Sequence, residues 1–369
     1  MSKVSPFGTL AALAICTGSA AFSGTLTTTL GAMQLDTMVE GLDVPWGFAF
    51  LPEGGVLITE REGALLFSKG GQTHQVSGMP KVEADGQGGL LDIMLPRDFS
   101  ATREVFFTFS KRQGSGSGTA LAKGRLSKDL RQINDVDVIF EATPSTSGGR
   151  HFGSRIVEAP DGSLFVTLGE RGDRPSAQDL GREQGSIIRI NRDGSIPGDN
   201  PFVGTSGAQP AIWSFGHRNP QGMALDASGQ LWAVEHGARG GDEVNKITKG
   251  ANYGWPVISY GRHYSGRKIG EGTQKAGMEQ PDWYWDPSIA PSGMMIYSGK
   301  LWPEWRGDIF VGSLKFDYIS RLSGRNLTEV EQLQSDETGR IRDLREAPDG
   351  SIWFASEQEG ALIRISPKP

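Results

Sequence analysis

Two glycine-rich loops within residues 212–245 carry most of the side chains in this sequence that could bind an anionic ligand. Their reactive residues are Arg218, Asn219, His236, Arg239, Asp242 and Glu243, within the stretch IWSFGHRNPQGMALDASGQLWAVEHGARGGDEVN. Arginine and asparagine donate hydrogen bonds to carboxylates, and an acidic glycine-rich loop supplies the oxygen atoms that calcium prefers. The stretch therefore indicates a site for an anionic, metal-assisted ligand, although a surface hairpin with charged turns has the same composition.

The segment between the two loops must bring them together. Residues 222–234 alternate in polarity around a turn at Ala227-Ser228-Gly229, a pattern that predicts two antiparallel strands. Because a hairpin returns the chain to the end from which it started, we expect both loops at the same end of one sheet.

A histidine in another glycine-rich loop is a candidate general base. His151 lies in Gly148-Gly149-Arg150-His151-Phe152-Gly153, directly before a predicted strand, and glycines let a ligand approach the backbone closely. Histidine titrates near neutral pH, which suits a base. Glu170 follows the predicted strand 164–168 and could orient the imidazole. A structural or solvated histidine is the alternative.

Further polar side chains lie at the ends of predicted strands. Gln87 occupies a flexible turn before an apolar strand, and Lys315 is a cation at an expected sheet end. Arg340 and Arg342 alternate along a strand, so both guanidiniums are expected on one side, where they could cradle carboxylates. Solvated surface charges would produce the same pattern.

A recurring strand motif predicts the fold. A turn with proline, aspartate or glycine precedes alternating apolar residues at 52–59, 96–109, 160–167, 226–234, 307–311 and 348–355. A second strand follows at 63–67, 186–190, 317–322 and 360–365. These repeats predict an all-β fold, a six-bladed β-propeller of four-stranded antiparallel blades with long loop insertions, in preference to a β-sandwich. The strand near residues 35–39 is expected to complete the last blade, and helices should be few and short.

The composition is that of a loop-rich globular protein. Among 369 residues there are 52 glycines and 20 prolines, with 37% hydrophobic residues and a net charge of −6 at pH 7. Such a charge gives no electrostatic reason to expect nucleic acid as a partner.

Residues 1–23 differ from the rest of the chain. Lys3 precedes a mostly apolar run that ends in Ala21-Phe22-Ser23, which predicts a cleaved signal peptide and no stable membrane insertion. The single cysteine, Cys16, lies in this run, and the bulky Ile15 argues against lipid attachment there. The mature chain would then lack disulfides, cysteine–zinc sites and thiol catalysis. We expect one propeller domain over residues 24–369, periplasmic or secreted from a bacterium.

Taken together, the motifs resemble those of the soluble quinoprotein sugar dehydrogenases, in particular the aldose sugar dehydrogenase branch. The resemblance is carried, in order, by GQGGLL, RHFGSRI, GHRNPQG, EHGARGGDE, NYGWP and RIRD followed by PDG. Members of that family are six-bladed propellers that bind pyrroloquinoline quinone (PQQ) and calcium at the top of the ring. They oxidise the anomeric carbon of aldoses to lactones. The resemblance implies an aldose substrate and an external electron acceptor, and the chain would act as a monomer or homodimer.

The resemblance also implies residue roles. His151, partnered by Glu170, would remove the proton from the anomeric hydroxyl while hydride passes to the quinone C5, and Arg218 would stabilise the developing negative charge. The residues implied in holding the cofactor are Gln87, His151, Arg218, Asn219, His236, Asp242, Lys315, Arg340 and Arg342. Calcium would take the carbonyls of Gly237 and Ala238 and act as a Lewis acid on the C5 carbonyl. Glu243 and the Tyr253 carbonyl match positions that hold a second, structural calcium.

Some positions depart from the family pattern, and two other functions remain open. Ala238 replaces a common proline, Glu170 replaces the aspartate of the glucose dehydrogenase branch, and His236 replaces that branch's glutamine, which favours the broader aldose branch.

A calcium-dependent six-bladed lactonase would need carboxylates and an asparagine around one ion in the central channel. A non-enzymatic propeller that binds a glycan or a partner is the third possibility.

Overall fold

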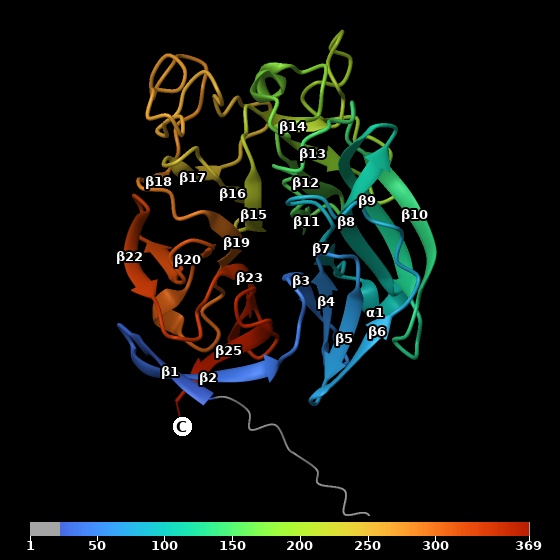
Figure 1. Ribbon diagram of the computed structural model, residues 1–369, viewed down its shortest axis with the longest axis vertical. Helices are drawn as coiled ribbons and strands as arrows, with labels where there is room; N and C mark the ends of the chain where they lie inside the picture. Colours follow the sequence, from blue (N-terminus) through green and yellow to red (C-terminus); the bar gives the residue numbers. More distant parts are fainter. Residues whose placement is uncertain (1–22, 369) are drawn as a thin grey trace, which may run out of the picture.

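The strand repeats form six antiparallel sheets arranged around a central axis (Figure 1). This computed structural model describes residues 23–368. Cys16 and all of the predicted signal peptide except Ser23 lie outside the described residues. In every sheet the first strand is innermost, and these six strands contact one another around the axis. The predicted six-bladed propeller is confirmed.

The blades are numbered in chain order. Blade 1 contains β3 (Pro45–Phe50), β4 (Val56–Glu60), β5 (Leu65–Lys69) and β6 (Gln72–Val76); blade 2 contains β7 (Leu90–Met94), β8 (Glu104–Gln113), β9 (Gly116–Leu126) and β10 (Ile133–Glu141). Blade 3 contains β11 (Ile156–Glu158), β12 (Leu164–Leu168), β13 (Ser186–Ile190) and β14 (Ile212–Phe215); blade 4 contains β15 (Pro220–Leu225), β16 (Leu231–Glu235), β17 (Asp242–Lys246) and β18 (Trp283–Trp285). Blade 5 contains β19 (Pro291–Ile296), β20 (Ile309–Ser313), β21 (Ile319–Ser323) and β22 (Thr328–Leu333).

Blade 6 combines the two ends of the described chain. Its strands β23 (Ile341–Glu346), β24 (Ile352–Ser356) and β25 (Ala361–Pro367) are joined by β2 (Gly31–Val39), which pairs with β25. This is the closure that was predicted from residues 35–39. One detail differs from the predicted four-stranded blade, because β1 (Ser23–Thr28) folds back on β2 and adds a fifth strand.

Each copy of the sequence motif becomes the second strand of a blade, namely β4, β8, β12, β16, β20 and β24. Helices within residues 23–368 are few and short, as expected: α1 (Phe99–Thr102) and the 3₁₀ turns η1 (Arg174–Gln178) and η2 (Pro303–Trp305). None of them is long and apolar enough to cross a membrane.

The core of the protein lies between the blades. Apolar residues from the facing sheets of each neighbouring pair form one buried cluster, so six such clusters encircle the axis. Between blades 6 and 1, for example, Leu362 and Ala355 pack with Phe48 and Ile58. Burial of this kind supplies the main driving force for folding and fixes each blade relative to the next.

Irregularities in strand pairing recur where the inner strands begin. The register between the first and second strands shifts at Pro45/Gly47, Leu90/Ile93, Pro220/Gly222, Pro291/Met294 and Ile341/Asp343. A β-bulge redirects the side chain at the shift. At this rim the shifts therefore turn side chains such as Trp46 and Arg342 toward the axis, where both line a cavity.

Buried threonines in the second strands of blades 1 to 3 link each of these blades to the next. The hydroxyl of Thr59 accepts a hydrogen bond from the Gly47 N–H at 3.0 Å and donates to the Leu91 carbonyl of the next blade at 2.6 Å. Thr108 and Thr167 occupy the same position in blades 2 and 3 and make the equivalent pair of bonds.

Candidate active site

A polar cavity of about 300 Å³ lies on the axis at the rim where the inner strands begin. All six blades contribute to its wall: Trp46, Arg61, Gly86, Gln87, Leu91, Phe152, Gly153, Ser154, Asn219, Gln221, His236, Ala290, Leu314, Arg340, Arg342 and Glu357. Most predicted cofactor-binding residues are therefore gathered in or beside one space.

The predicted hairpin that brings the two loops together is present. Strands β15 and β16 pair antiparallel, and they place the 217–219 loop beside the loop that begins at His236. The His236 N–H donates to the Asn219 carbonyl at 3.2 Å, and the Arg218 guanidinium donates to the His236 carbonyl at 3.3 Å.

His151 and Glu170 form a buried pair next to Gln87 and Phe152, which line the cavity. The Nδ1 of His151 lies 2.7 Å from Oε1 of Glu170, and the His151 backbone N–H donates to Oε1 of Gln87 at 2.7 Å. His151 adopts a φ of 56°, a left-handed conformation unusual for a non-glycine residue. Gly169 permits this packing, because a Cβ there would lie 2.1 Å from the His151 carbonyl oxygen.

The surroundings of His151 favour the neutral imidazole. Burial lowers the pKa of His151 below its ordinary value of 6.5; Glu170 opposes this shift and Arg218 adds to it. Because Nδ1 faces a carboxylate, the tautomer with a proton on Nδ1 is favoured. Among residues 23–368 no group hydrogen-bonds Nε2, so that nitrogen presents a lone pair.

Arg218 is a buried cation that has no carboxylate within ion-pair distance in the described part of the chain. Its guanidinium lies 5.3 Å from the Trp255 ring centroid, and its Nε is buried without a hydrogen-bond partner. Burial lowers the pKa of Arg218, although the field of Glu170 offsets part of that effect. A buried cation with unused donors is suited to an anionic ligand.

Asn219 and His236 direct polar atoms at the cavity. The Asn219 Oδ1 accepts from the Gly153 N–H at 3.1 Å, which leaves its Nδ2 donors without a partner among the described residues. The His236 Nε2 lies 2.7 Å from the Pro291 carbonyl. Burial and the nearby Arg218 lower the pKa of His236 to about 3, so its ring is neutral at ordinary pH.

Asp242, which is predicted to hold the cofactor, binds two loops at the edge of the cavity. It is fully buried, and its carboxylate accepts hydrogen bonds from the N–H groups of Gly237, Ile289 and Ala290 and from the Ser288 hydroxyl. The carboxylate therefore ties the 237–241 loop to the 288–290 loop at the cavity edge.

The three remaining predicted cations lie at the rim of blades 5 and 6. Arg340 and Arg342 do point to the same side, where both form ion pairs with Glu357 at 2.5 Å. Burial opposes ionisation of Glu357, but the two arginines lower its pKa. Lys315 is exposed and donates to the Ser288 carbonyl at 3.2 Å. One carboxylate thus offsets part of this positive charge, which the sequence did not reveal.

The candidate metal ligands surround a much smaller cavity of about 10 Å³, lined by Gly237, Glu243 and Tyr253 together with Glu235. Glu243 and Glu235 are opposite each other on β17 and β16, and burial together with Glu235 raises the pKa of Glu243 well above its ordinary value. Two crowded carboxylates beside backbone carbonyls suit a hard divalent cation. No three His, Cys, Asp or Glu side chains cluster as a metal site within residues 23–368.

The Ala238 carbonyl is already engaged. It accepts the Arg262 N–H at 2.9 Å, and Ala238 is fully buried against Trp255 and Ile269. Any bond from the Ala238 oxygen to calcium would therefore use its second lone pair. The Gly237 carbonyl oxygen accepts no hydrogen bond from a described residue, so both of its lone pairs are available.

Several functional neighbours were missed by sequence reasoning. Glu235 accepts the Arg218 N–H at 2.7 Å and the His217 ring at 2.8 Å, and His217 stacks on Tyr253 at 4.5 Å. His217 directly precedes Arg218, so its place in the sequence could have identified it as a neighbour of the site. Gln221 and Glu357 contact Arg342 only through tertiary structure.

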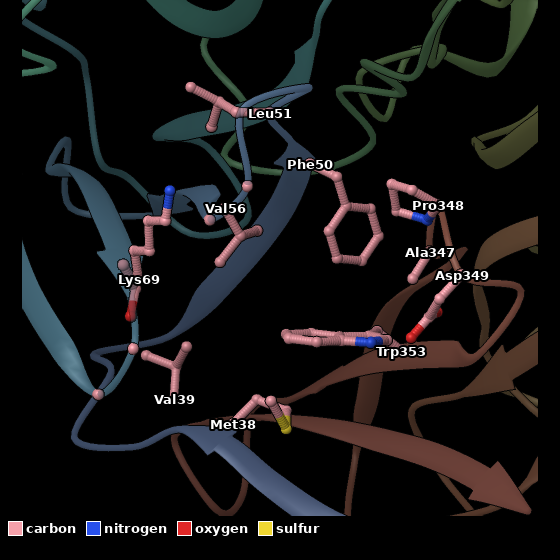
Figure 2. A pocket seen from close by; sticks show the side chains of 15 residues that line it. Met38, Val39, Phe50, Leu51, Val56, Lys69, Ala347, Pro348, Asp349 and Trp353 are labelled. Atoms are coloured by element: carbon pink, nitrogen blue, oxygen red, sulfur yellow. The ribbon is translucent and has the colours of Figure 1, made fainter.

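The opposite rim has different chemistry. A groove of about 370 Å³ between blades 6 and 1 is bordered by Met38, Phe50, Pro348 and Trp353, with Lys69 at its edge (Figure 2). Phe50 and Trp353 meet edge to face at 5.1 Å. This apolar surface has no group suited to acid–base chemistry beyond Lys69 and Asp349, so the cavity at the other rim is the candidate active site.

The architecture and the cavity define a six-bladed propeller that gathers cations and a buried His–Glu pair on its axis. The chain belongs to the glucose/sorbosone dehydrogenase family, whose model matches residues 42–364. It is 43% identical to the aldose sugar dehydrogenase YliI of Escherichia coli K12 over 364 residues, which cover 96% of this chain and 97% of that protein. The family predicted from the motifs is confirmed, and the chain is an oxidoreductase of the sugar dehydrogenase type.

Solved structures agree with this assignment. The apo form of the soluble aldose sugar dehydrogenase from Escherichia coli matches with a TM-score of 0.88 at 43% identity, covering 91% of this chain and 100% of that chain. The PQQ-bound aldose sugar dehydrogenase from Streptomyces coelicolor matches with a TM-score of 0.75 at 26% identity, covering 94% and 99%.

Proposed function

We propose that this protein is a PQQ- and calcium-dependent dehydrogenase that oxidises the anomeric carbon of aldoses to lactones and passes the electrons to an external acceptor. The observation that carries the proposal is the buried Arg218, which has no carboxylate partner and acts on the His151–Glu170 pair. The next residue after each, Phe152 and Asn219, lines the axial cavity. Its relatives include an aldose sugar dehydrogenase and a PQQ-bound structure.

The donors in the cavity fit a planar tricarboxylate cofactor. Arg218 has a buried Nε–H without a partner, Asn219 offers its Nδ2 donors, and Arg340, Arg342 and Lys315 supply positive charge from the rim of blades 5 and 6. Gln87 would keep its link to the His151 backbone and use its amide donors. The neutral His236 would contribute through Nδ1, and Asp242 would act by holding the loops that shape the cavity. When bound, PQQ would supply the two-electron acceptor.

The protein's part in the reaction is proton transfer and charge stabilisation. The free Nε2 lone pair of His151 would accept the proton of the anomeric hydroxyl, while Nδ1–H stays hydrogen-bonded to Glu170. The carboxylate of Glu170 would stabilise the imidazolium that forms. Arg218 is positioned to stabilise negative charge that develops on oxygen within the cavity.

Calcium would be held at the rim of blade 4. The carbonyl oxygens of Gly237 and Ala238 would bind the calcium ion beside the cofactor, Ala238 through its second lone pair. This ion would act as a Lewis acid. Glu243 and the Tyr253 carbonyl would hold a structural ion in the small cavity, and Glu235 would add a second carboxylate.

A calcium-dependent lactonase is disfavoured by the chemistry of the central channel. The buried carboxylates there, Asp92 and Asp343, form ion pairs with Arg155 and Arg345 at 2.5–3.0 Å. These carboxylates are neutralised by arginines, so they are poorly suited to bind an ion themselves. The oriented His–Glu pair also favours catalysis over passive glycan binding.

An omission experiment tests the proposal. Purified apoprotein would be mixed with PQQ, calcium, an aldose and a redox dye, and each component would be left out in turn. We expect dye reduction only in the complete mixture. The variant His151→Ala should still bind PQQ and lose about 10²- to 10⁴-fold in turnover, the range of general-base catalysis. A folded protein that reduces no dye with any of a panel of aldoses would refute the proposal.

If residues 1–23 act as a signal peptide, the enzyme would work in the periplasm or outside the cell. That location would let it pass electrons to an acceptor outside the cytoplasm.

A further inference from the structure

One aromatic side chain on the cavity wall has no role in the chemistry described above. We propose that Trp46 is an additional cofactor-binding residue, whose indole N–H donates to an anionic oxygen of the bound quinone cofactor. This inference rests on the proposed PQQ dependence, because it assigns a further donor to the same cavity.

The backbone places Trp46 at the same structural position as Arg342. Trp46 lies at the register shift between Pro45 and Gly47 in β3, and Arg342 lies at the shift between Ile341 and Asp343 in β23. Both side chains line the cavity. The feature of the fold that presents a guanidinium from blade 6 therefore presents an indole from the neighbouring blade 1.

Two arginines restrict the orientation of the Trp46 ring. The Arg155 guanidinium lies 4.9 Å from the ring centroid, and that of Arg342 lies 5.8 Å away. Arg155 is itself fixed, since it pairs with Asp92 at 2.9 Å and with Asp343 at 3.0 Å. Trp46 is thus held before any ligand arrives, which lowers the entropy that binding must overcome.

The indole N–H of Trp46 is a hydrogen-bond donor without an acceptor among the described residues. Trp46 is 4% exposed, and its Nε1–H donates to no residue in the described part of the chain. By contrast, Trp353 and Trp285 donate to Ser351 and Glu329. The indole nitrogens of Trp255, Trp283 and Trp305 are also buried without a partner, but these residues do not line the axial cavity, whereas Trp46 does. A buried indole N–H normally has a hydrogen-bond acceptor, and a ligand oxygen in the cavity would be that acceptor for Trp46.

The variant Trp46→Phe tests this inference because it removes the donor and keeps an aromatic ring. Apoprotein would be titrated with PQQ at saturating calcium by isothermal titration calorimetry. We expect the Kd for PQQ to rise about tenfold, the effect of losing one hydrogen bond to a charged oxygen. The thermal midpoint of the apoprotein should stay close to that of the wild type, since the lost N–H has no partner in the protein.

Trp353→Phe is the matched control, because Trp353 lies in the apolar groove at the opposite rim. It should leave the Kd for PQQ unchanged. An unchanged Kd in Trp46→Phe would overturn the inference, and so would a weaker Kd accompanied by an equal loss of stability in the apoprotein. If the wild type itself bound no PQQ, the proposed function would fail together with this inference, so the two failures are distinguishable.

Discussion

At the scale of single residues, the site depends on how burial and neighbours set charge. His151 is kept neutral by burial although a carboxylate touches it, whereas Arg218 is buried without such a partner. The first arrangement produces a base and the second produces a cation available to an anion. The side chains of His151 and Arg218, both buried beside the axial cavity, thus have opposite roles because only that of His151 has a carboxylate within hydrogen-bond distance.

The pH dependence of the reaction tests the role of Glu170. Since the base must be deprotonated, kcat/KM should fall as pH drops through the pKa of His151, which lies below 6.5. Glu170 raises that pKa, so Glu170→Gln should move the acid limb to still lower pH. Turnover should also fall about 10²-fold, because the imidazolium loses its carboxylate.

The control for this prediction is His74→Ala, because the His74 ring contacts the Leu130 carbonyl outside the cavity and the variant should leave the profile unchanged. A limb that stays in place or moves to higher pH in Glu170→Gln would contradict the assignment.

At the scale of elements, bulges and hydroxyls shape the rim. The register shifts aim Trp46, Leu91, Gln221 and Arg342 at the cavity, and buried threonines bind the backbone N–H groups next to the shifts in blades 1 and 2. In blades 1 and 2 the threonine that binds the backbone at the register shift also bonds the next blade.

A substitution of Thr59 tests this coupling. Thr59→Val keeps the shape of the side chain but leaves the Gly47 N–H and the Leu91 carbonyl unpaired in the interior. We expect the free energy of unfolding to fall by about 2–4 kcal/mol, from two buried groups that lose their partner. Chemical denaturation would measure the change. Thr328→Val, at an exposed position of β22 where the hydroxyl bonds no described residue, should change stability by less than about 0.5 kcal/mol; an equal effect of both variants would refute the coupling.

The sequence predicts elements better than it predicts pairings. Alternation and turn residues located the second strand of every blade, and the hairpin around residues 227–229 followed from local pattern. The ion pairs of Glu357 with Arg340 and Arg342 were not predictable, because they depend on how a loop folds back. The hydrogen bonds that Asp242 accepts from residues 288–290 were equally unpredictable, since nothing in the local sequence places that loop around it.

At the scale of the whole molecule, the cavity exists only because the ring is closed. Its wall takes residues from all six blades, and closure depends on β2, which comes from the other end of the chain to pair with β25. Below the cavity, the ion pairs of Asp92 and Asp343 with Arg155 and Arg345 join blades 2, 3 and 6 across the axis. A site assembled in this way should bind one cofactor per chain.

The most direct test of the central claim is an activity titration of the apoprotein with PQQ at saturating calcium and aldose. We predict that dye reduction rises linearly with added PQQ and stops rising at one PQQ per chain. In His151→Ala, the same titration by calorimetry should give the same stoichiometry while activity stays at background. Activity that does not depend on PQQ, or a folded protein that takes up none, would contradict the account.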